Sequence, residues 1–149
     1  MAKAISVLCL LTVALLGCGG GDSAEKFAQK GVAHFQKQEY DQAIASYQKA
    51  LQLEPKAAAV YNLLGMAYRM KYNQLGNPEL RQKEIEAFQK AIELDPRYWV
   101  ALFNLGATYY FMGEKAKAAP LLKKALELNP DHPEKSQIEK MIAEGEKQP

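Results

Sequence analysis

Among the side chains that most often bind metals or act as nucleophiles, this chain has two cysteines and two histidines. A zinc site needs three or four such ligands together, and a nucleophilic site needs a base beside the nucleophile. Cys9 and Cys18 both stand near the N-terminus, whereas His34 and His132 are far apart with no second ligand pair at metal spacing. The sequence has no glycine-rich phosphate loop and no nucleophile elbow. We therefore predict no enzyme activity, no metal site and no non-covalent cofactor.

Cys18 is the exception, because it ends an apolar run. Residues 4–16 follow Lys3 and are almost wholly apolar, but they are too few for a membrane span, which needs about 20 residues. Residues 15–18 read Leu-Leu-Gly-Cys and resemble the bacterial lipobox. The resemblance implies that residues 1–17 are a signal peptide, and that Cys18 carries diacylglycerol after the cut. An ordinary secretory signal and a short buried helix are the alternatives.

The residues after Cys18 bear on the location of the protein. Residues 18–23 are rich in glycine and are predicted to form a flexible tether. Acyl chains contribute about 0.8 kcal/mol of membrane binding per buried CH₂ group. Aspartate after the lipidated cysteine is typical of inner-membrane retention, and this chain has Gly19 there. By resemblance to such lipoproteins, we expect an anchor in the outer membrane, facing the periplasm.

The composition is that of a folded domain without affinity for nucleic acid. Of the 149 residues, 48% are apolar and 24% are charged, and the net charge is +2. The basic residues alternate with acidic ones and form no stripe that could follow a phosphate backbone. We therefore expect partners other than nucleic acid.

A short phrase recurs three times along the chain. It reads ALQLEP up to Pro55, AIELDP up to Pro96 and ALELNP up to Pro130, each time a helical pattern stopped by proline. A phrase repeated in register indicates a structural unit copied in tandem. The last two prolines are 34 residues apart and the first two are 41 apart, so the middle unit holds 7 extra residues.

Each unit contains two helical patterns of apolar residues at spacings of three and four. Small residues recur where the two helices would approach, and large ones lie beside them. The sequence resembles tetratricopeptide repeats, whose 34-residue pattern is carried here by Phe27, Gly31, Ala43, Tyr47, Ala50 and Pro55; by Tyr61, Leu64, Gly65, Tyr68, Phe88, Ala91 and Pro96; and by Leu102, Leu105, Gly106, Tyr109, Ala118, Leu122, Ala125 and Pro130.

The resemblance implies an all-α solenoid of helical hairpins. The three repeats would occupy residues 24–57, 58–98 and 99–132, and residues 133–149 would form a capping helix and tail ending at Gly145. Asp131 and Glu134 have the spacing of a capping box for that last helix. His34 is expected on the buried face of the first helix, and His132 in a solvated linker.

Several residues depart from the repeat pattern. Lys30 and His34 make the first unit more polar, as expected of a terminal repeat. Pro120 lies within the last repeat's second helix, and we expect it near the first turns. Glu84 stands where a small residue is usual, and we predict that it cannot occupy so tight a contact, so that the packing shifts locally.

The 7-residue insertion is predicted to lengthen both helices of the middle hairpin by about one turn. Gly76 is typical of a helix end, and Asn77 followed by Pro78 is typical of a helix start. We therefore expect one helix over residues 57–75 and another over 78–94. Residues 72–82 form the tip of this hairpin and are the most individual feature of the sequence.

The resemblance also implies a concave groove lined by the first helix of each repeat. The family's clamp for a C-terminal carboxylate is absent, because its basic positions hold Ala28 and Val100. What remains is an aromatic and thioether surface with amides that could hold backbone groups of a partner segment. Packing between helices is the alternative role for each of these residues. Besides Ala28 and Val32, the predicted groove residues are Phe35, Asn62, Leu63, Met66, Met70, Phe103, Asn104, Tyr110 and Phe111.

These inferences favour a lipid-anchored adaptor that holds another envelope protein in its groove. Lipoproteins with such repeats serve pilus or secretin assembly, outer-membrane protein assembly and peptidoglycan enzymes. The alternative is a structural subunit that associates with copies of itself and has no dedicated peptide ligand.

Overall fold

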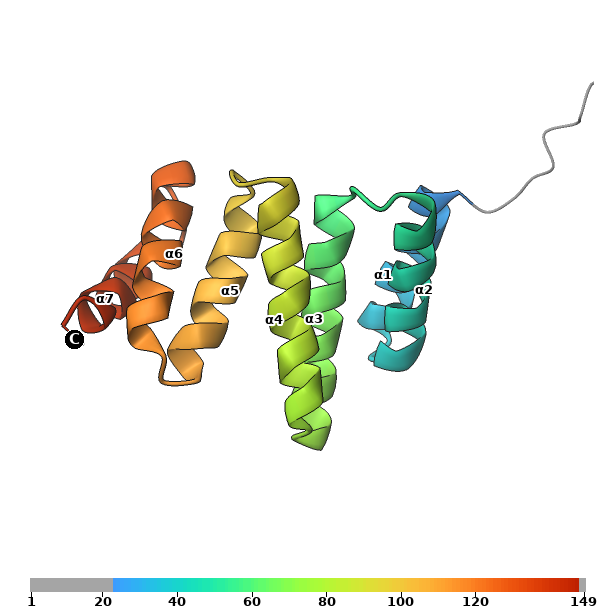
Figure 1. Cartoon of the computed structure of the whole chain (residues 1–149), viewed down its shortest axis with the longest axis horizontal. Coiled ribbons are helices and arrows are strands. Elements are labelled where there is room, and N and C mark those ends of the chain that lie inside the picture. Colours follow the sequence, from blue (N-terminus) through green and yellow to red (C-terminus); the bar gives the residue numbers. More distant parts are fainter. Residues whose placement is uncertain (1–22, 148–149) are drawn as a thin grey trace, which may run out of the picture.

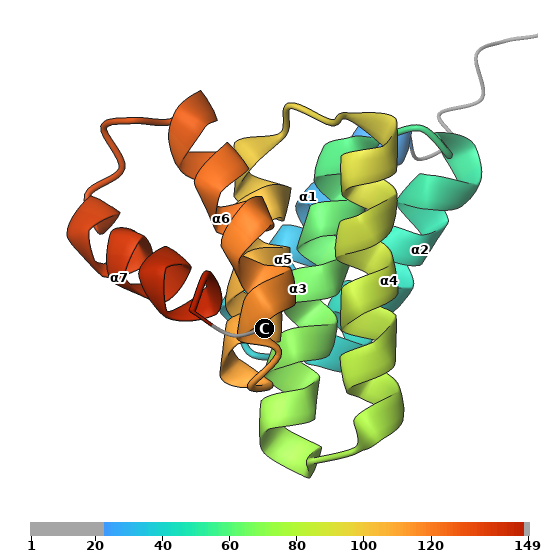
Figure 2. The same ribbon diagram turned by 60° about the vertical axis from the view of Figure 1, so that its left-hand side comes forward.

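The protein folds into a row of helical hairpins. A computed structural model describes residues 23–147, and within them every regular element is a helix. Three antiparallel hairpins stand side by side along the longest axis, and α7 packs beside α6 at one end (Figures 1 and 2). The helices of the described part are α1 (Ala24–Gln36), α2 (Tyr40–Leu53), α3 (Ala58–Leu75), α4 (Pro78–Leu94), α5 (Trp99–Phe111), α6 (Lys115–Leu128) and α7 (Lys135–Gly145).

The predicted signal peptide, Cys18 and the tether up to residue 22 lie outside the described residues. Within residues 23–147, none of the helices combines the length and the hydropathy that a membrane span requires.

The middle hairpin is longer than its neighbours, as predicted. α3 has 18 residues and α4 has 17, compared with 13 and 14 in the other two hairpins, and its tip projects past theirs (Figure 1). Gly76 ends α3 with a left-handed φ of 65°. The Asn77 side chain accepts a hydrogen bond from the Glu79 backbone N–H at 2.9 Å, and Pro78 is the first helical residue. The insertion is therefore an ordered extension of both helices.

Each hairpin closes around a glycine that faces a large side chain, as the pattern predicts. Gly31 faces the Tyr47 ring, Gly65 faces Phe88, and Gly106 faces Leu122. A Cβ atom at position 65 would lie 2.7 Å from the Phe88 ring. These contacts let the two helices of a hairpin approach closely, and no larger residue fits without displacing one of them.

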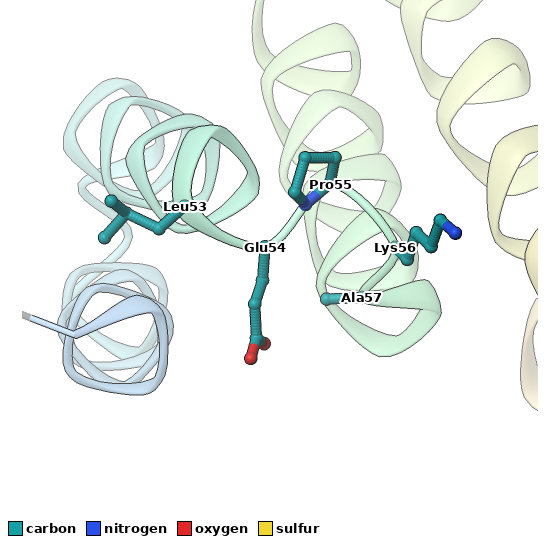
Figure 3. Close-up of a pocket in the computed structure, with 5 residues that line it drawn as sticks. All are labelled: Leu53, Glu54, Pro55, Lys56 and Ala57. Carbon is teal, nitrogen blue, oxygen red and sulfur yellow. The ribbon is translucent and has the colours of Figure 1, made fainter.

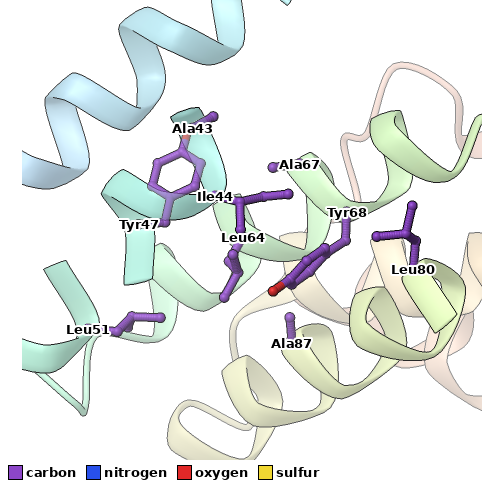
Figure 4. Packing of buried hydrophobic residues seen from close by; sticks show 9 residues of the cluster. All are labelled: Ala43, Ile44, Tyr47, Leu51, Leu64, Ala67, Tyr68, Leu80 and Ala87. Carbon is purple, nitrogen blue, oxygen red and sulfur yellow. The ribbon is translucent and has the colours of Figure 1, made fainter. Parts of the chain in front are cut away.

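The hydrophobic core runs through the row of hairpins as linked clusters. One cluster joins the first two hairpins and includes Tyr47, Leu64 and Tyr68, which come from α2 and α3 (Figure 4). A second cluster, with Ile85, Phe88 and Leu105, joins the middle hairpin to the third. A third cluster is made of α6 and α7 residues, among them Ile138 at 1% exposure. Each hairpin thus buries its apolar surface against its neighbour, as repeat proteins do.

Glu84 overturns one prediction. It does occupy the position of the usual small residue, and its side chain is fully buried at 0% exposure. The position tolerates glutamate because Arg69 neutralises the carboxylate, while Arg81 and Thr108 donate further hydrogen bonds to it. A buried charge is retained only when it is paired in this way.

The start of α7 also differs from the prediction. Glu134 is the N-cap residue, but its side chain makes no capping hydrogen bond, so the predicted capping box with Asp131 is wrong. The Glu134 backbone N–H instead donates to Nδ1 of His132 at 3.1 Å. The predicted end of the helix at Gly145 is confirmed.

Pro120 lies in the second turn of α6, close to the helix start as predicted. It is past the first turn, however, where a missing N–H would cost nothing. The helix therefore lacks one hydrogen bond, to the carbonyl of Ala116. Both residues are exposed, so water can satisfy that carbonyl.

Candidate functional site

The predicted groove residues lie on the first helix of each hairpin. Phe35 is on α1, four of the nine are on α3, and four are on α5. Phe111 is by far the most open of them, with 77% of its surface exposed. Phe35 packs edge-on against Tyr40 with ring centroids 5.5 Å apart, and Leu63 and Met66 contact the core clusters. Most of the predicted surface is thus shared between interhelix packing and solvent.

The two amides of the set bind one another. Asn104 donates from Nδ2 to Oδ1 of Asn62 at 3.0 Å, and their exposures are 8% and 3%. Asn62 Nδ2 lies 3.8 Å from the sulfur of Met66, and Asn104 Oδ1 accepts from Arg69. The amides therefore tie α5 to α3, and a partner segment would have to break these bonds in order to use them.

One further residue of the set, Tyr110, contacts α7. The Tyr110 hydroxyl donates to Oε2 of Glu144 at 2.7 Å, and Lys115 donates to the same oxygen at 2.7 Å. The lysine, and then the tyrosine, lower the pKa of Glu144, while the hydrogen bond to Glu144 raises the pKa of Tyr110. Tyr110 thus helps to fasten the last helix.

His132 is not the solvated linker residue that the sequence suggested. Its ring lies between Trp99 and Phe103, with centroids 5.6 Å and 5.1 Å away. The misreading arose because the contact joins residues that are distant in sequence. Phe103, predicted to face a partner, therefore packs under the loop before α7.

His34 is half-buried as part of a pair. Its Nδ1 atom lies 2.6 Å from Oε2 of Glu39, and 26% of its side chain is exposed. Among residues 23–147, no group of three or more histidine, cysteine, aspartate or glutamate side chains is arranged to hold a metal ion.

Sequence reasoning missed a polar network at the junction of the middle and third hairpins. Arg69 Nε donates to Oε1 of Glu84 at 2.8 Å, and Arg81 Nη1 donates to Oε2 at 2.5 Å. Thr108 donates to Oε1 at 2.6 Å. Arg69 also donates to the Asn104 carbonyl and to Thr108, each at 2.8 Å. The signal that could have revealed this network was Glu84, an acid at a position where the repeat pattern has a small residue.

A cavity of about 310 Å³ opens beside this network. It lies between α3, the start of α4 and the end of α5, where the insertion adds length to the middle hairpin. Its lining combines guanidinium groups, an amide, a hydroxyl and an aromatic ring: Arg69, Asn73, Arg81, Ala107, Thr108 and Phe111. Charged and apolar groups thus meet at one opening.

A larger hollow of about 500 Å³ lies at the turn between α2 and α3. Its lining residues are consecutive, Leu53 to Ala57, and the side chains of Leu53 and Lys56 point in opposite directions (Figure 3). No set of functional groups converges there, so the smaller cavity is the better candidate site.

Comparison with known proteins identifies the repeats. Residues 31–71 match a family model described as "TPR repeat", and residues 99–132 match one described as "Tetratricopeptide repeat". The chain is a tetratricopeptide repeat (TPR) protein. The all-α architecture of hairpins followed by a capping helix is therefore confirmed.

Curated relatives share the repeats but are much longer. This TPR chain is 35% identical over 100 residues to the human protein O-mannosyl-transferase TMTC1, covering 66% of the chain and 11% of that protein. It is 32% identical over 111 residues to the Hsp70-Hsp90 organizing protein of Triticum aestivum, covering 74% of the chain and 18% of that protein. The chain thus spans less than a fifth of the length of these relatives.

Solved structures of TPR domains have the same fold. The first TPR of Spaghetti (RPAP3), bound to the HSP90 peptide SRMEEVD, superposes with a TM-score of 0.71 at 21% identity, covering 82% of this chain and 94% of that one. MamA superposes with a TM-score of 0.64 at 31% identity, covering 78% of this chain and 62% of that one.

Proposed function

We propose that this TPR protein is a non-catalytic adaptor that binds a segment of a partner protein on the face formed by α1, α3 and α5. The observation that carries the proposal is Phe111, which is 77% exposed at the end of α5 and lines the 310 Å³ cavity. A large aromatic side chain left open beside a cavity is typical of an interaction site. The solved TPR domain that holds an HSP90 peptide supports peptide binding as a use of this fold.

We further propose that the adaptor belongs to a bacterial envelope and is anchored by lipid on Cys18. The support is the sequence: the apolar residues 4–16, the Leu-Leu-Gly-Cys ending and the glycines that follow. With Gly19 after the cysteine, the outer membrane facing the periplasm is the proposed location. Partners of the proposed kind include pilus or secretin components, outer-membrane assembly factors and peptidoglycan enzymes.

The anchor is tested by replacing the acylated sulfur. Cys18→Ser should abolish incorporation of radiolabelled palmitate and leave the uncleaved precursor in the cells, because cleavage follows acylation. Cys9→Ser is the matched control, since it changes the other cysteine of the sequence inside the segment to be removed. Equal labelling of Cys18→Ser and the parent chain would exclude lipidation at this residue.

The binding face is tested by crosslinking and pull-down from native membranes. Phe111→Ala should reduce recovery of crosslinked partners several-fold while leaving the thermal midpoint unchanged, because this ring is 77% exposed. Phe103 is a poor choice for such a test, since its ring packs against His132. Leu53→Ala is the control: that side chain is 54% exposed but lies at the α2–α3 turn. Undiminished recovery with Phe111→Ala would contradict the proposal.

Self-association is the second candidate function. Its support is a set of exposed apolar side chains at the ends of α3 and α5, namely Leu75, Phe111 and Met112 at 64%, 77% and 42% exposure. Size-exclusion chromatography with light scattering on a chain starting at Gly19 separates the two candidates. A monomer favours the adaptor, whereas an oligomer that grows with concentration favours the structural subunit.

A further inference from the structure

The arginines of this chain are concentrated at one point. The sequence contains Arg69, Arg81 and Arg97, and the first two converge on the single carboxylate of Glu84. Within residues 23–147, no other acidic side chain is paired with either of them. The cluster therefore carries one positive charge in excess.

Arg69 alone meets the structural need of Glu84. Its guanidinium reaches Glu84, Asn104 and Thr108 through four hydrogen bonds, so nearly all of its N–H groups are used. A buried carboxylate paired with one well-bonded arginine is already neutralised. Arg81 is thus additional to what the fold requires.

Arg81 is held in place but is largely unbonded. Its guanidinium carbon lies 3.9 Å from the centroid of the Tyr72 ring, and one of its nitrogens donates to Glu84. An arginine has five N–H groups in a planar fork, and stacking on an aromatic ring fixes the orientation of that fork. Its side chain is 19% exposed and lines the cavity, so the remaining donors are fixed beside an opening.

The other lining residues indicate which kind of ligand the free N–H groups of Arg81 could bind. Asn73 supplies an amide, and Phe111 supplies an exposed ring beside the charged groups. One excess positive charge balances a singly charged anion, whereas a doubly charged phosphate would leave one negative charge uncompensated. A planar carboxylate suits the fork of an arginine, which can bind both of its oxygens.

We propose that this cavity binds a carboxylate of the partner segment, with an apolar side chain next to that carboxylate packing on Phe111. The inference rests on the proposed adaptor function and specifies its ligand. The site differs from the terminal-carboxylate clamp of the family, because Ala28 and Val100 occupy the basic positions of that clamp. Its key donor, Arg81, comes from the first turn of α4, in the hairpin that the insertion lengthens.

The first test uses the full chain in nonionic detergent and a minimal probe, phenylpropanoate, with phenylpropanamide as the uncharged control. The readout is the NMR signal of the arginine Nε–H groups, of which this sequence has three. The acid should shift the Arg81 signal saturably and leave Arg97 unmoved, while the amide shifts neither. Absence of a saturable Arg81 shift, or equal shifts with acid and amide, overturns the proposal.

Matched variants test whether the charge of Arg81 binds the probe. Arg81→Gln should weaken phenylpropanoate binding by about tenfold or more, because one charged hydrogen-bond donor is lost. Arg97→Gln removes the same charge from an exposed position outside the cavity and should leave binding unchanged. Circular dichroism checks that both variants remain folded. Binding that Arg81→Gln does not weaken overturns the proposal.

Two synthetic heptapeptides then identify the source of the carboxylate. One has an internal glutamate beside a leucine and an amidated C-terminus; the other has no acidic residue and ends in leucine with a free carboxylate. The peptide that binds more weakly to Arg81→Gln shows whether the carboxylate comes from a glutamate side chain or from a C-terminus. If neither peptide depends on Arg81, the cavity is not a partner site. Such a failure leaves the adaptor function standing, because Phe111→Ala tests that separately on the native partner.

Discussion

Oε1 of Glu84 lies 2.8 Å from Nε of Arg69, inside a helix contact that other repeats of this chain fill with alanine. The equivalent residues are Ala43 and Ala118, both fully buried at 0% exposure. The middle repeat therefore replaces an apolar contact by an ion pair that links α4 to α3, and through Thr108 to α5. The pair both holds two hairpins together and orients the arginine cluster at the candidate site.

Removing the charge of Glu84 should destabilise the protein. Glu84→Gln leaves two arginines beside a neutral group, and we expect the free energy of unfolding to fall by about 2–3 kcal/mol. The value lies at the low end for a buried pair because the arginine side chains are 25% and 19% exposed. Urea unfolding followed by circular dichroism measures it.

A double variant tests whether Glu84 and Arg69 stabilise the protein as a pair or independently. Glu84→Ala combined with Arg69→Leu restores an apolar contact like that of the other repeats. The double variant should lose less free energy of unfolding than the two single variants lose together. As a control, Glu93→Gln breaks the exposed pair with Lys90 and should leave the free energy of unfolding nearly unchanged. Additive losses in the double variant would mean that the two side chains act independently.

The sequence predicted those features that depend on residues close together in the chain or fixed by the repeat pattern. The bounds of α3 and α4 were predictable because Gly76, Asn77 and Pro78 act on their own backbone. The pairing of small and large residues was predictable because the repeat fixes both partners. The burial of Glu84 was not, since it depends on Thr108, which is 24 residues away.

The candidate site was predictable only in part. The sequence placed Phe111 at the end of the first helix of the third repeat, but neighbouring helices set its exposure. Asn62 and Asn104 bond to each other across 42 residues, a pairing that periodicity does not encode. Arg81 could be placed at the hairpin tip, yet its stacking on Tyr72 requires the turn at Gly76 to bring two helices together. Long-range side-chain contacts thus account for most of what was missed.

The turn between α1 and α2 contains a strained residue. Gln38 has a φ of 62°, and the equivalent turn of the third hairpin has Gly113 at 83°. A side chain in the left-handed region costs about 1–2 kcal/mol, and glycine avoids that cost but loses more entropy on folding. Gln38→Gly should therefore raise the free energy of unfolding by about 0.5–1 kcal/mol, as measured by urea unfolding. Gly113→Ala should lower it by about 1 kcal/mol, and a stabilising Gly113→Ala would refute the strain argument.

Ionisation of a buried tyrosine should limit stability in alkali. Burial raises the pKa of Tyr47 from 10.0 to about 12. The folded state therefore favours the neutral phenol, and this contribution is complete below pH 10 and is lost as the pH rises from 10 through 12. A shift of about two pKa units corresponds to about 3 kcal/mol at most. The Tyr47→Phe variant has no hydroxyl to ionise at this position, so its stability should fall less steeply as the pH rises through this range.

Thermal unfolding at successive pH values provides the comparison. Lysine deprotonation and the other buried tyrosines affect both proteins alike, so the difference between Tyr47→Phe and the parent chain isolates the phenol. Identical alkaline profiles would show that Tyr47 ionises as easily in the folded state as in the unfolded chain.

The last prediction sets packing against helix propensity. Gly145 closes α7 against α6, and a Cβ atom there would meet the carbonyl oxygen of Lys115 and lie 2.8 Å from Cβ of Ala119. In a free helix, replacing glycine by alanine is favourable by about 1 kcal/mol. Here the added methyl group must push α7 away, and overpacking of this kind costs about 1–3 kcal/mol. Gly145→Ala should therefore lower stability in urea unfolding.

Ala143→Gly measures the contribution of helix propensity by itself. Ala143 is exposed on the same helix, so the substitution changes no packing contact. It should cost about 1 kcal/mol. Destabilisation in both directions, alanine to glycine at 143 and glycine to alanine at 145, is the signature of a tight contact. If Gly145→Ala is stabilising instead, α7 does not press on α6, and the bonds of Glu144 to Tyr110 and Lys115 would have to hold the capping helix without close backbone packing.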